Sequence, residues 1–377
     1  MTSTSSHRKQ GLWQGIQWAM EPGAPGGGTS RARLVWRTLK ASLWHGKALR
    51  RWMTVVQELH ARGIIRDLPG EYLRAVRPYV HRRTGFDERV VQLIDHADWL
   101  ETAFKPAAFE QLASGKPLVL AELVAPRGYD FMRLQLQQAS VQSPEGELLL
   151  TLSLQRSADV QHRPQPVDAG VLAFSRFRVD GVACLVIGGV RGQRNQVMRV
   201  STMEVSQALQ GWKPAVLMVR VAQELARFWG LHLVGLDPAA HRLHGLSYQL
   251  NKRYRDAGLR IYSSYDALWD HFEAKPGPPG WMIVPLNSDE KLAATALSPE
   301  KRERQTRRAD YWIRTRNLLR VQLRLLLQRP GLEARLSRVT ESVDRDSAAA
   351  VLGGEDFQNS EDLVPSRVLQ TGPGTLV

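Results

Sequence analysis

The chain has 377 residues, and its 51 lysines and arginines against 37 aspartates and glutamates give a formal net charge of +14. Such a charge attracts phosphate-rich partners, namely nucleic acid, anionic lipid headgroups or a phosphorylated cofactor. The single cysteine, Cys184, excludes an intrachain disulfide, and its apolar neighbours favour a buried thiol over a nucleophile. No run of about eighteen apolar residues is present, so we expect no transmembrane segment. The basic start is not followed by an apolar core of seven residues, so we expect no secretory signal.

Composition divides the chain into five parts. Residues 1–30 form a flexible leader, because they end in a stretch rich in proline and glycine. Residues 31–110 carry apolar residues at helical spacing with basic residues between them, which predicts a helical N-terminal part. Residues 115–290 are expected to form an α+β core domain. Residues 298–330 predict a basic amphipathic helix, and residues 340–377 a disordered acidic tail.

The core domain begins with short strand-like runs separated by turn residues. We expect strands over residues 117–124, 129–139, 147–156, 171–179 and 182–190. Asp180-Gly181 joins the last two as a tight hairpin, and the short turns indicate an antiparallel meander. A strong helix over 214–229 and a strand over 231–236 follow. The predicted fold class is therefore α+β: a helical N-terminal part, then a mostly antiparallel sheet with helices.

Several segments carry a family resemblance. They are residues 185–192, Gly211-Trp212-Lys213-Pro214, Arg253-Tyr254, Tyr265-Asp266-Ala267-Leu268-Trp269, and the basic run that begins at Lys301-Arg302. Together they resemble a family of Gram-negative bacterial proteins typified by VirK and YbjX, although that family's usual glutamine is Arg191 here. The resemblance implies a role in virulence, envelope integrity, antimicrobial-peptide resistance or stress response. It implies no catalytic residues, because none are agreed for the family.

The end of the strand over 182–190 is the best ligand candidate. Gly188, Gly189 and Gly192 would let a phosphate approach the backbone, and Arg191 and Arg194 would supply charge. The order of the predicted elements resembles that of GNAT-type acyltransferases: an antiparallel meander, a strand that ends in glycines, a helix and a further strand. Those enzymes hold acyl-CoA at the end of the glycine-bearing strand. About twenty residues separate Gly192 from the helix at Pro214, whereas the acyltransferase loop enters its helix directly. The alternative is a bulge that needs glycine for close packing.

Candidate catalytic residues follow the strand over 231–236. His241 and His244 would share one face of a helix, and either is a candidate general base. Tyr262 is the candidate acid, and Glu204 an alternative base. We predict no metal site, because no further ligand cluster accompanies the two histidines.

The basic helix offers an anionic-surface site. Tyr311, Trp312, Leu318, Leu319, Leu325 and Leu326 are expected on its packed side, and the proposed contacts to lipid or nucleic-acid phosphates are Arg307, Arg308, Arg316, Arg320 and Arg324.

Three hypotheses remain. The first is a factor without established chemistry that supports the envelope from the cytoplasmic face of the inner membrane. The second is an acyltransferase-like enzyme with an acyl-CoA or acyl-carrier donor. The third, stress-linked nucleic-acid binding, rests on charge without a motif.

Overall fold

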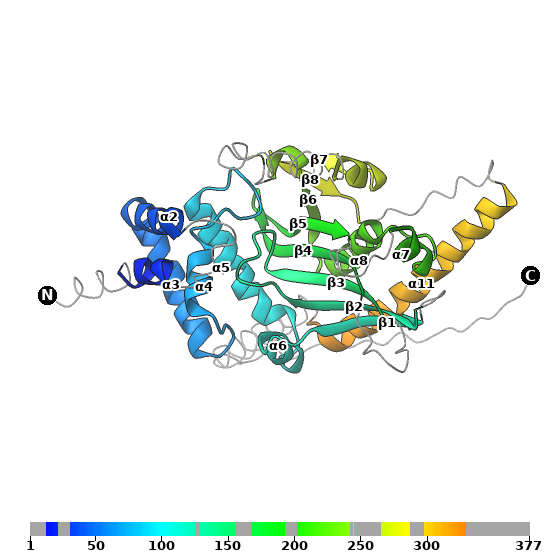
Figure 1. Cartoon of the computed structure of the whole chain (residues 1–377), viewed down its shortest axis with the longest axis horizontal. Coiled ribbons are helices and arrows are strands. Elements are labelled where there is room, and N and C mark those ends of the chain that lie inside the picture. The colour runs from blue at the N-terminus through cyan, green and yellow to red at the C-terminus, as the bar shows by residue number, and fades with distance from the viewer. Residues whose placement is uncertain are drawn as a thin grey trace, which may run out of the picture. The chain divides into compact units, whose positions relative to one another are not determined.

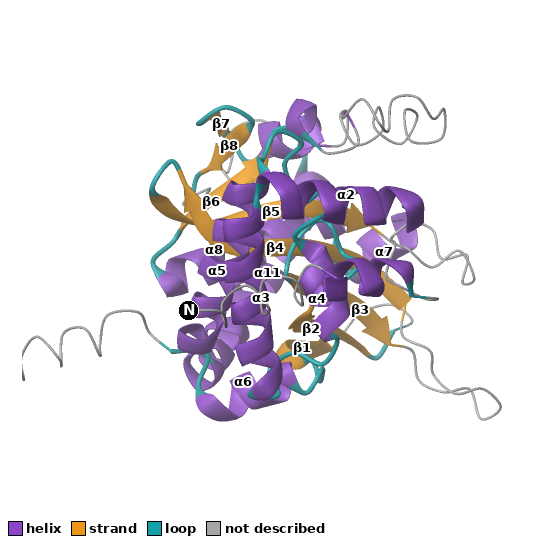
Figure 2. Ribbon diagram, turned by 90° about the vertical axis from the view of Figure 1, so that its left-hand side faces the viewer, coloured by secondary structure: helices purple, strands orange, loops and turns teal. Residues whose placement is uncertain are grey.

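The computed structural model describes residues 13–21, 31–124, 129–155, 167–192, 202–241, 244, 265–286 and 298–328. The predicted acidic tail and parts of the leader lie outside these residues. The structure confirms the mixed α+β class, with helices on both sides of an eight-stranded, mostly antiparallel sheet (Figures 1 and 2).

The sheet has the strand order β1-β2-β3-β4-β5-β6-β8-β7. The strands are β1 Leu118–Val124, β2 Phe131–Gln138, β3 Leu148–Gln155, β4 Val167–Val179, β5 Val182–Gly192, β6 His232–Leu236, β7 Lys275–Pro276 and β8 Trp281–Val284. Each neighbouring pair is antiparallel except β5 and β6, which run parallel. A parallel pair needs a crossover connection, and the long helix between these two strands provides it.

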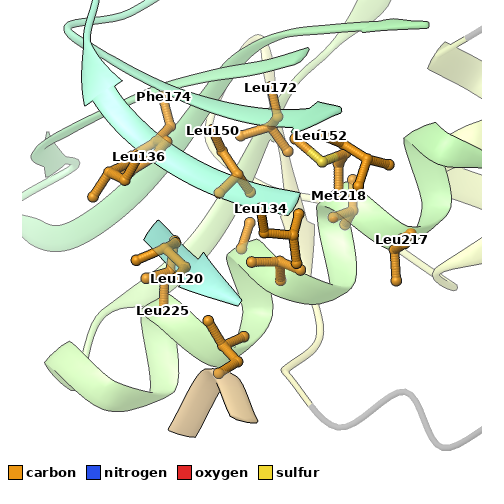
Figure 3. Packing of buried hydrophobic residues seen from close by; sticks show 14 of the residues in the cluster. Leu120, Leu134, Leu136, Leu150, Leu152, Leu172, Phe174, Leu217, Met218 and Leu225 are labelled. Atoms are coloured by element: carbon orange, nitrogen blue, oxygen red, sulfur yellow. The ribbon is translucent and has the colours of Figure 1, made fainter. Parts of the chain in front are cut away.

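The crossover helix α8 (Pro214–Trp229) lies on one face of the sheet. Its apolar side chains pack on alternate residues of the strands, and Figure 3 draws Met218 and Leu225 in one cluster with Leu134 and Leu150. The alternation of residues in β2 explains why this face of the sheet binds the helix. Leu134 and Leu136 point to the buried face, whereas Gln135 is half-buried on the other face. Gly230 ends the helix in the left-handed conformation, at φ 64°.

Two more helical elements flank that face. Helix α7 (Thr202–Ala208) precedes α8, and the basic helix α11 (Pro299–Leu326) contacts both α8 and β1. Tyr311, Trp312 and Leu319 of α11 are buried. Leu318 and Leu325, which the sequence placed with them, are exposed.

The N-terminal helices cover part of the opposite face. They are α2 Arg31–Trp44, α3 Gly46–Ala61, α4 Leu68–Arg74 and α5 Phe86–Ala103. The next helix, α6 Pro106–Ala113, instead packs Ala108 and Leu112 into the cluster on the α8 side. Trp52 and Leu93 belong to the cluster that also contains Phe177 and Val186 of the sheet. Residues 13–20, within the predicted flexible leader, are helical because Trp18 packs against Tyr72, with ring centroids 5.4 Å apart.

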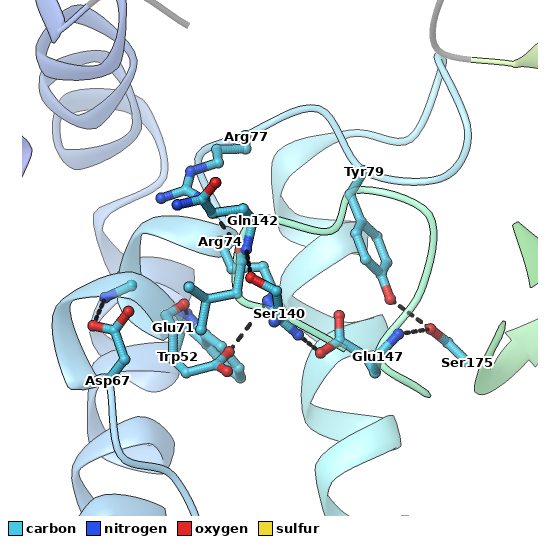
Figure 4. Close-up of polar contacts among 12 residues, drawn as sticks. Trp52, Asp67, Glu71, Arg74, Arg77, Tyr79, Ser140, Gln142, Glu147 and Ser175 are labelled. Carbon is cyan, nitrogen blue, oxygen red and sulfur yellow. Dashed lines mark hydrogen bonds and ion pairs between the residues drawn. The ribbon is translucent and has the colours of Figure 1, made fainter. Parts of the chain in front are cut away.

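A charged network is buried where these helices meet the sheet (Figure 4). Arg74 forms ion pairs with Glu71 and with Glu147, and its side chain is 4% exposed. Nearby, the Tyr79 hydroxyl lies 2.7 Å from Ser175 Oγ, which accepts the backbone N–H of Glu147 at 3.0 Å. Helical layer and sheet are therefore joined by polar contacts as well as by apolar packing.

Candidate functional site

Strand β5 extends beyond the end of its parallel neighbour. Cys184–Ile187 of β5 pairs with His232–Gly235 of β6, and β5 then continues to Gly192. On its other side the register with β4 shifts, so that Gly188 is an extra residue between paired positions. A bulge of this kind bends a strand, and here it lies where β5 leaves β6.

The two glycines at the bulge are covered by the connection between β2 and β3. A Cβ atom at Gly188 would collide with the backbone oxygen of Glu145, and one at Gly189 with the Glu145 carboxylate. Close packing therefore requires glycine at both positions. The predicted open phosphate cradle is not found on this face, because a carboxylate occupies it and would repel an anion.

The charged residue after the bulge is held by the same carboxylate. Arg191 donates from Nη2 and Nε to Glu145 Oε2, at 2.6 and 3.0 Å, and its side chain is 40% exposed. Gly192 has open space where a side chain would lie, whereas Arg194 lies outside the described residues. The four described residues of the predicted cofactor site, Gly188, Gly189, Arg191 and Gly192, thus do not form one open cradle.

Beside Arg191, the part of the sheet face that no described helix covers forms a hollow of about 610 Å³. Its floor is made by outward residues of β2, β3 and β4, and its wall by residues 140–145. This volume lies within the usual range for small-molecule sites.

The predicted catalytic residues lie in different surroundings. His241 is buried, with its ring centroid 6.3 Å from that of Tyr265. Burial and the nearby Arg82 lower the pKa of His244. Glu204 on α7 accepts a hydrogen bond from the hydroxyl of Tyr129, a residue that lies just before β2 in the sequence. Tyr262 lies outside the described residues.

Tyr265, which the sequence marked only as part of the family resemblance, lies at the point where β5 and β6 separate. Its hydroxyl accepts the backbone N–H of Val190 at 2.8 Å. Trp269, one helical turn later, donates from Nε1 to the carbonyl oxygen of Leu236 at 3.0 Å. These two side chains therefore satisfy backbone groups at the ends of both strands. The described residues contain no group of three or more metal-ligating side chains.

The arginines of α11 are mostly engaged within the protein. Arg316 and Arg320 pair with Glu224 of α8, which is 3% exposed, at 3.5 and 2.8 Å. The Arg308 guanidinium lies 4.4 Å from the centroid of a Trp212 ring. Arg307 pairs with Glu303, and Arg324 is exposed. Part of the charge predicted to contact an anionic surface is therefore neutralised by Glu224.

A different helix, α2, presents basic and large apolar side chains on one exposed side. On α2, Trp36, Leu43 and Trp44 are 59%, 66% and 63% exposed, and Lys40 lies 5.7 Å from the Trp44 ring centroid. Positions 33, 36, 40, 43 and 44 share one side of a helix, opposite the buried Leu34 and Ala41. The sequence contains seven basic residues and no aspartate or glutamate from position 31 to position 57. We call this side the α2 face.

In the described part of the chain, no helix is both long and apolar enough to cross a membrane. No curated protein and no solved structure matches the chain. A family model described as a protein of unknown function, DUF535, matches residues 28–312, which is more than half of the sequence. The names VirK and YbjX do not come with that match and stay a prediction. The chain belongs to the DUF535 family of proteins of unknown function.

Proposed function

We propose that the protein binds an anionic membrane surface through the α2 face. The observation that carries the proposal is the pair of exposed tryptophans, Trp36 and Trp44, on a helix without an acidic residue. Tryptophan favours the boundary between headgroups and acyl chains, and interleaved lysine and arginine are attracted to anionic lipids. A basic helix with this pattern lies in the plane of the interface.

The energies favour reversible binding. Trp36, Leu43 and Trp44 are each about two-thirds exposed, so each would gain about 1–2 kcal/mol on leaving water. Each lysine or arginine near an anionic surface adds about 1 kcal/mol. The apolar and ionic contributions to the binding free energy are then comparable. Because salt screens only the ionic contribution, binding should weaken with salt without vanishing.

Helix α11 is the less favourable alternative. Its exposed Leu318 and Leu325 lie beside Arg314 and Arg324, but Arg316 and Arg320 are paired with Glu224. Figure 1 shows α2 to the left of the sheet and α11 below it and to its right, so a flat surface bound to α2 would not also contact α11. A position on the inner membrane would agree with the envelope role that the VirK and YbjX resemblance implies.

Vesicle sedimentation tests the proposal. The full chain is expected to sediment with vesicles of phosphatidylcholine and phosphatidylglycerol, and not with phosphatidylcholine alone. Trp36→Ser/Trp44→Ser should reduce the bound fraction at least tenfold, because two interfacial side chains are lost. The matched control Leu318→Ser/Leu325→Ser removes exposed apolar residues from α11 and should bind like the wild type. Binding lost only in the α11 variant, or absent from anionic vesicles at low salt, contradicts the proposal.

The end of β5 supports a second candidate, an acyltransferase-like enzyme. The observation is that Tyr265 holds the N–H of Val190 where two parallel strands separate, a place where an acyl carbonyl could replace the hydroxyl. The donor would have to approach from the β6 side, since Glu145 covers the glycines. Titration calorimetry with acetyl-CoA should give heat that changes in Tyr265→Phe, and no heat with the wild type contradicts this candidate.

A further inference from the structure

The hollow on the polar face of the sheet is built from neighbouring strands. Gln135 lies directly opposite Thr151, and Arg133 opposite Ser153, in the pairing of β2 with β3. Side chains at such paired positions stand about 5 Å apart on one face. The floor is therefore a fixed ladder of side chains, and it remains uncovered by the N-terminal helices.

The lining combines amides and hydroxyls with three aliphatic residues, Pro144, Leu149 and Val171. Gln135, Gln137 and Gln155 each provide a carbonyl acceptor and an amide donor, while Thr151 and Ser153 each provide a hydroxyl. Among the described lining residues none is aromatic. The lining therefore offers aliphatic contacts but no aromatic ring on which a flat ligand would stack.

The charges of the hollow are largely balanced. Arg133 pairs with Glu122 at 2.7 Å, and Arg191 pairs with Glu145 at 2.6 Å. Asp168 adds an exposed carboxylate at the edge. A phosphate would have to compete with two carboxylates for the arginines and would be repelled by a third. The electrostatics therefore disfavour an anionic ligand.

Two polar atoms on this lining have no hydrogen-bond partner in the described structure, namely Gln155 Oε1 and Ser143 Oγ. Buried polar atoms of this kind are normally satisfied by water or by a ligand. Both residues line the hollow, and a ligand hydroxyl is the kind of group that donates to the Gln155 oxygen and accepts from the Ser143 hydroxyl.

We propose that this hollow binds a neutral polyhydroxylated ligand, of the size of one or two sugar rings. Each sugar hydroxyl is both donor and acceptor, which matches a lining of amides, hydroxyls and paired charges. The volume of about 610 Å³ accommodates such a ligand. This site lies on β2 to β5 and does not depend on the membrane contact of α2.

Saturation-transfer NMR on the full chain tests the site, since a hollow without aromatic rings should bind weakly. Maltose and N-acetylglucosamine serve as neutral probes, and glucose 6-phosphate as the charged comparison. We expect transfer to at least one neutral sugar and at least fivefold less to glucose 6-phosphate. In Gln135→Leu/Thr151→Val, which keeps side-chain shape but removes polar groups, the neutral signal should fall at least fivefold.

The matched control is Gln57→Leu/Thr54→Val, the same chemical changes on exposed positions of α3. It should keep the wild-type signal. The site is overturned if neither neutral sugar receives transfer from the wild type, if both double variants respond alike, or if glucose 6-phosphate binds better. Circular dichroism of each variant separates loss of binding from loss of folding.

Discussion

Replacing Arg74 by methionine is expected to lower the free energy of unfolding by about 3–5 kcal/mol. Arg74 is paired with Glu71 and Glu147, whose side chains are 16% and 10% exposed. Methionine keeps much of the side-chain volume but leaves both carboxylates without their cation. Removing one member of a buried ion pair is costly, because the remaining charge can be neither solvated nor neutralised cheaply.

The effect should depend on pH in a defined direction. Burial already raises the pKa of Glu71, and the charge of Arg74 opposes that rise. Without Arg74 the pKa rises further, so the folded state of the variant binds protons that the unfolded state releases. The deficit in unfolding free energy should therefore be larger at pH 8 than at pH 5.

Urea denaturation measures both effects, and Arg62→Met is the matched control. Arg62 pairs with Glu101 at 2.7 Å, but its side chain is 55% exposed. A surface pair of this kind contributes at most about 1 kcal/mol. Equal losses in the two variants would contradict the structural role assigned to Arg74.

The second large effect concerns His96, and it predicts a loss of stability in mild acid. The ring is buried, its Nδ1 accepts the backbone N–H of Arg176 at 3.1 Å, and burial lowers its pKa to about 3. Arg74 and Arg176 add to that lowering. The folded protein thus keeps His96 neutral at a pH where the unfolded chain protonates it.

The size of this stability loss follows from the difference between the numbers of protons bound by the folded and unfolded states. A histidine with a lowered folded pKa contributes stability that is present above about pH 6.5 and is lost as the pH falls toward 3. One pKa unit is worth about 1.4 kcal/mol, so His96 should account for a loss of about 2 kcal/mol between pH 7 and pH 5.

The variant His96→Asn isolates this contribution. Asparagine keeps an acceptor near the Arg176 N–H but does not titrate in this range. Urea denaturation at pH 7 and pH 5 gives the unfolding free energy at each pH. Between these pH values the variant should lose about 2 kcal/mol less unfolding free energy than the wild type. An unchanged difference between the two pH values would show that His96 is not the group that titrates.

Local patterns in the sequence predict most individual elements. The alternation around Leu134 and Leu136 gives β2, and the apolar run over 214–229 gives α8. Local patterns do not predict the order of the strands in the sheet, because that order depends on contacts between segments far apart in the sequence. The parallel pairing of β5 with β6 joins Leu185 to Leu233, and no local signal specifies it.

The site illustrates the same limit. Glycines at 188 and 189 fit either a phosphate cradle or close packing, and Glu145, more than forty residues earlier, decides between them. Leu318 was expected to be buried and Arg316 free, but the buried carboxylate of Glu224 turns Arg316 and Arg320 toward α8. Such partners are known only once the fold is known.

The α2 face could not be predicted from the sequence, because exposure also depends on the fold. Both sides of this helix carry apolar residues, so periodicity alone favours packing on a core. The fold buries Leu34 and leaves Trp36 and Trp44 in water. Exposure of large apolar side chains, together with the absence of acidic residues over 31–57, is the signal that marks the face.

Membrane contact through α2 can be measured by spin labelling of the full chain. Leu43→Cys places a label on the α2 face, and Glu110→Cys places a control on α6, away from α2 in Figures 1 and 2. Burial raises the pKa of Cys184, whose thiol is buried, so it should not compete for the label. On anionic vesicles the label at position 43 should lose collisions with a water-soluble nickel chelate and gain collisions with oxygen, while the label at 110 stays unchanged. If vesicle-bound protein leaves position 43 as accessible to the chelate as position 110, the α2 face does not enter the membrane interface.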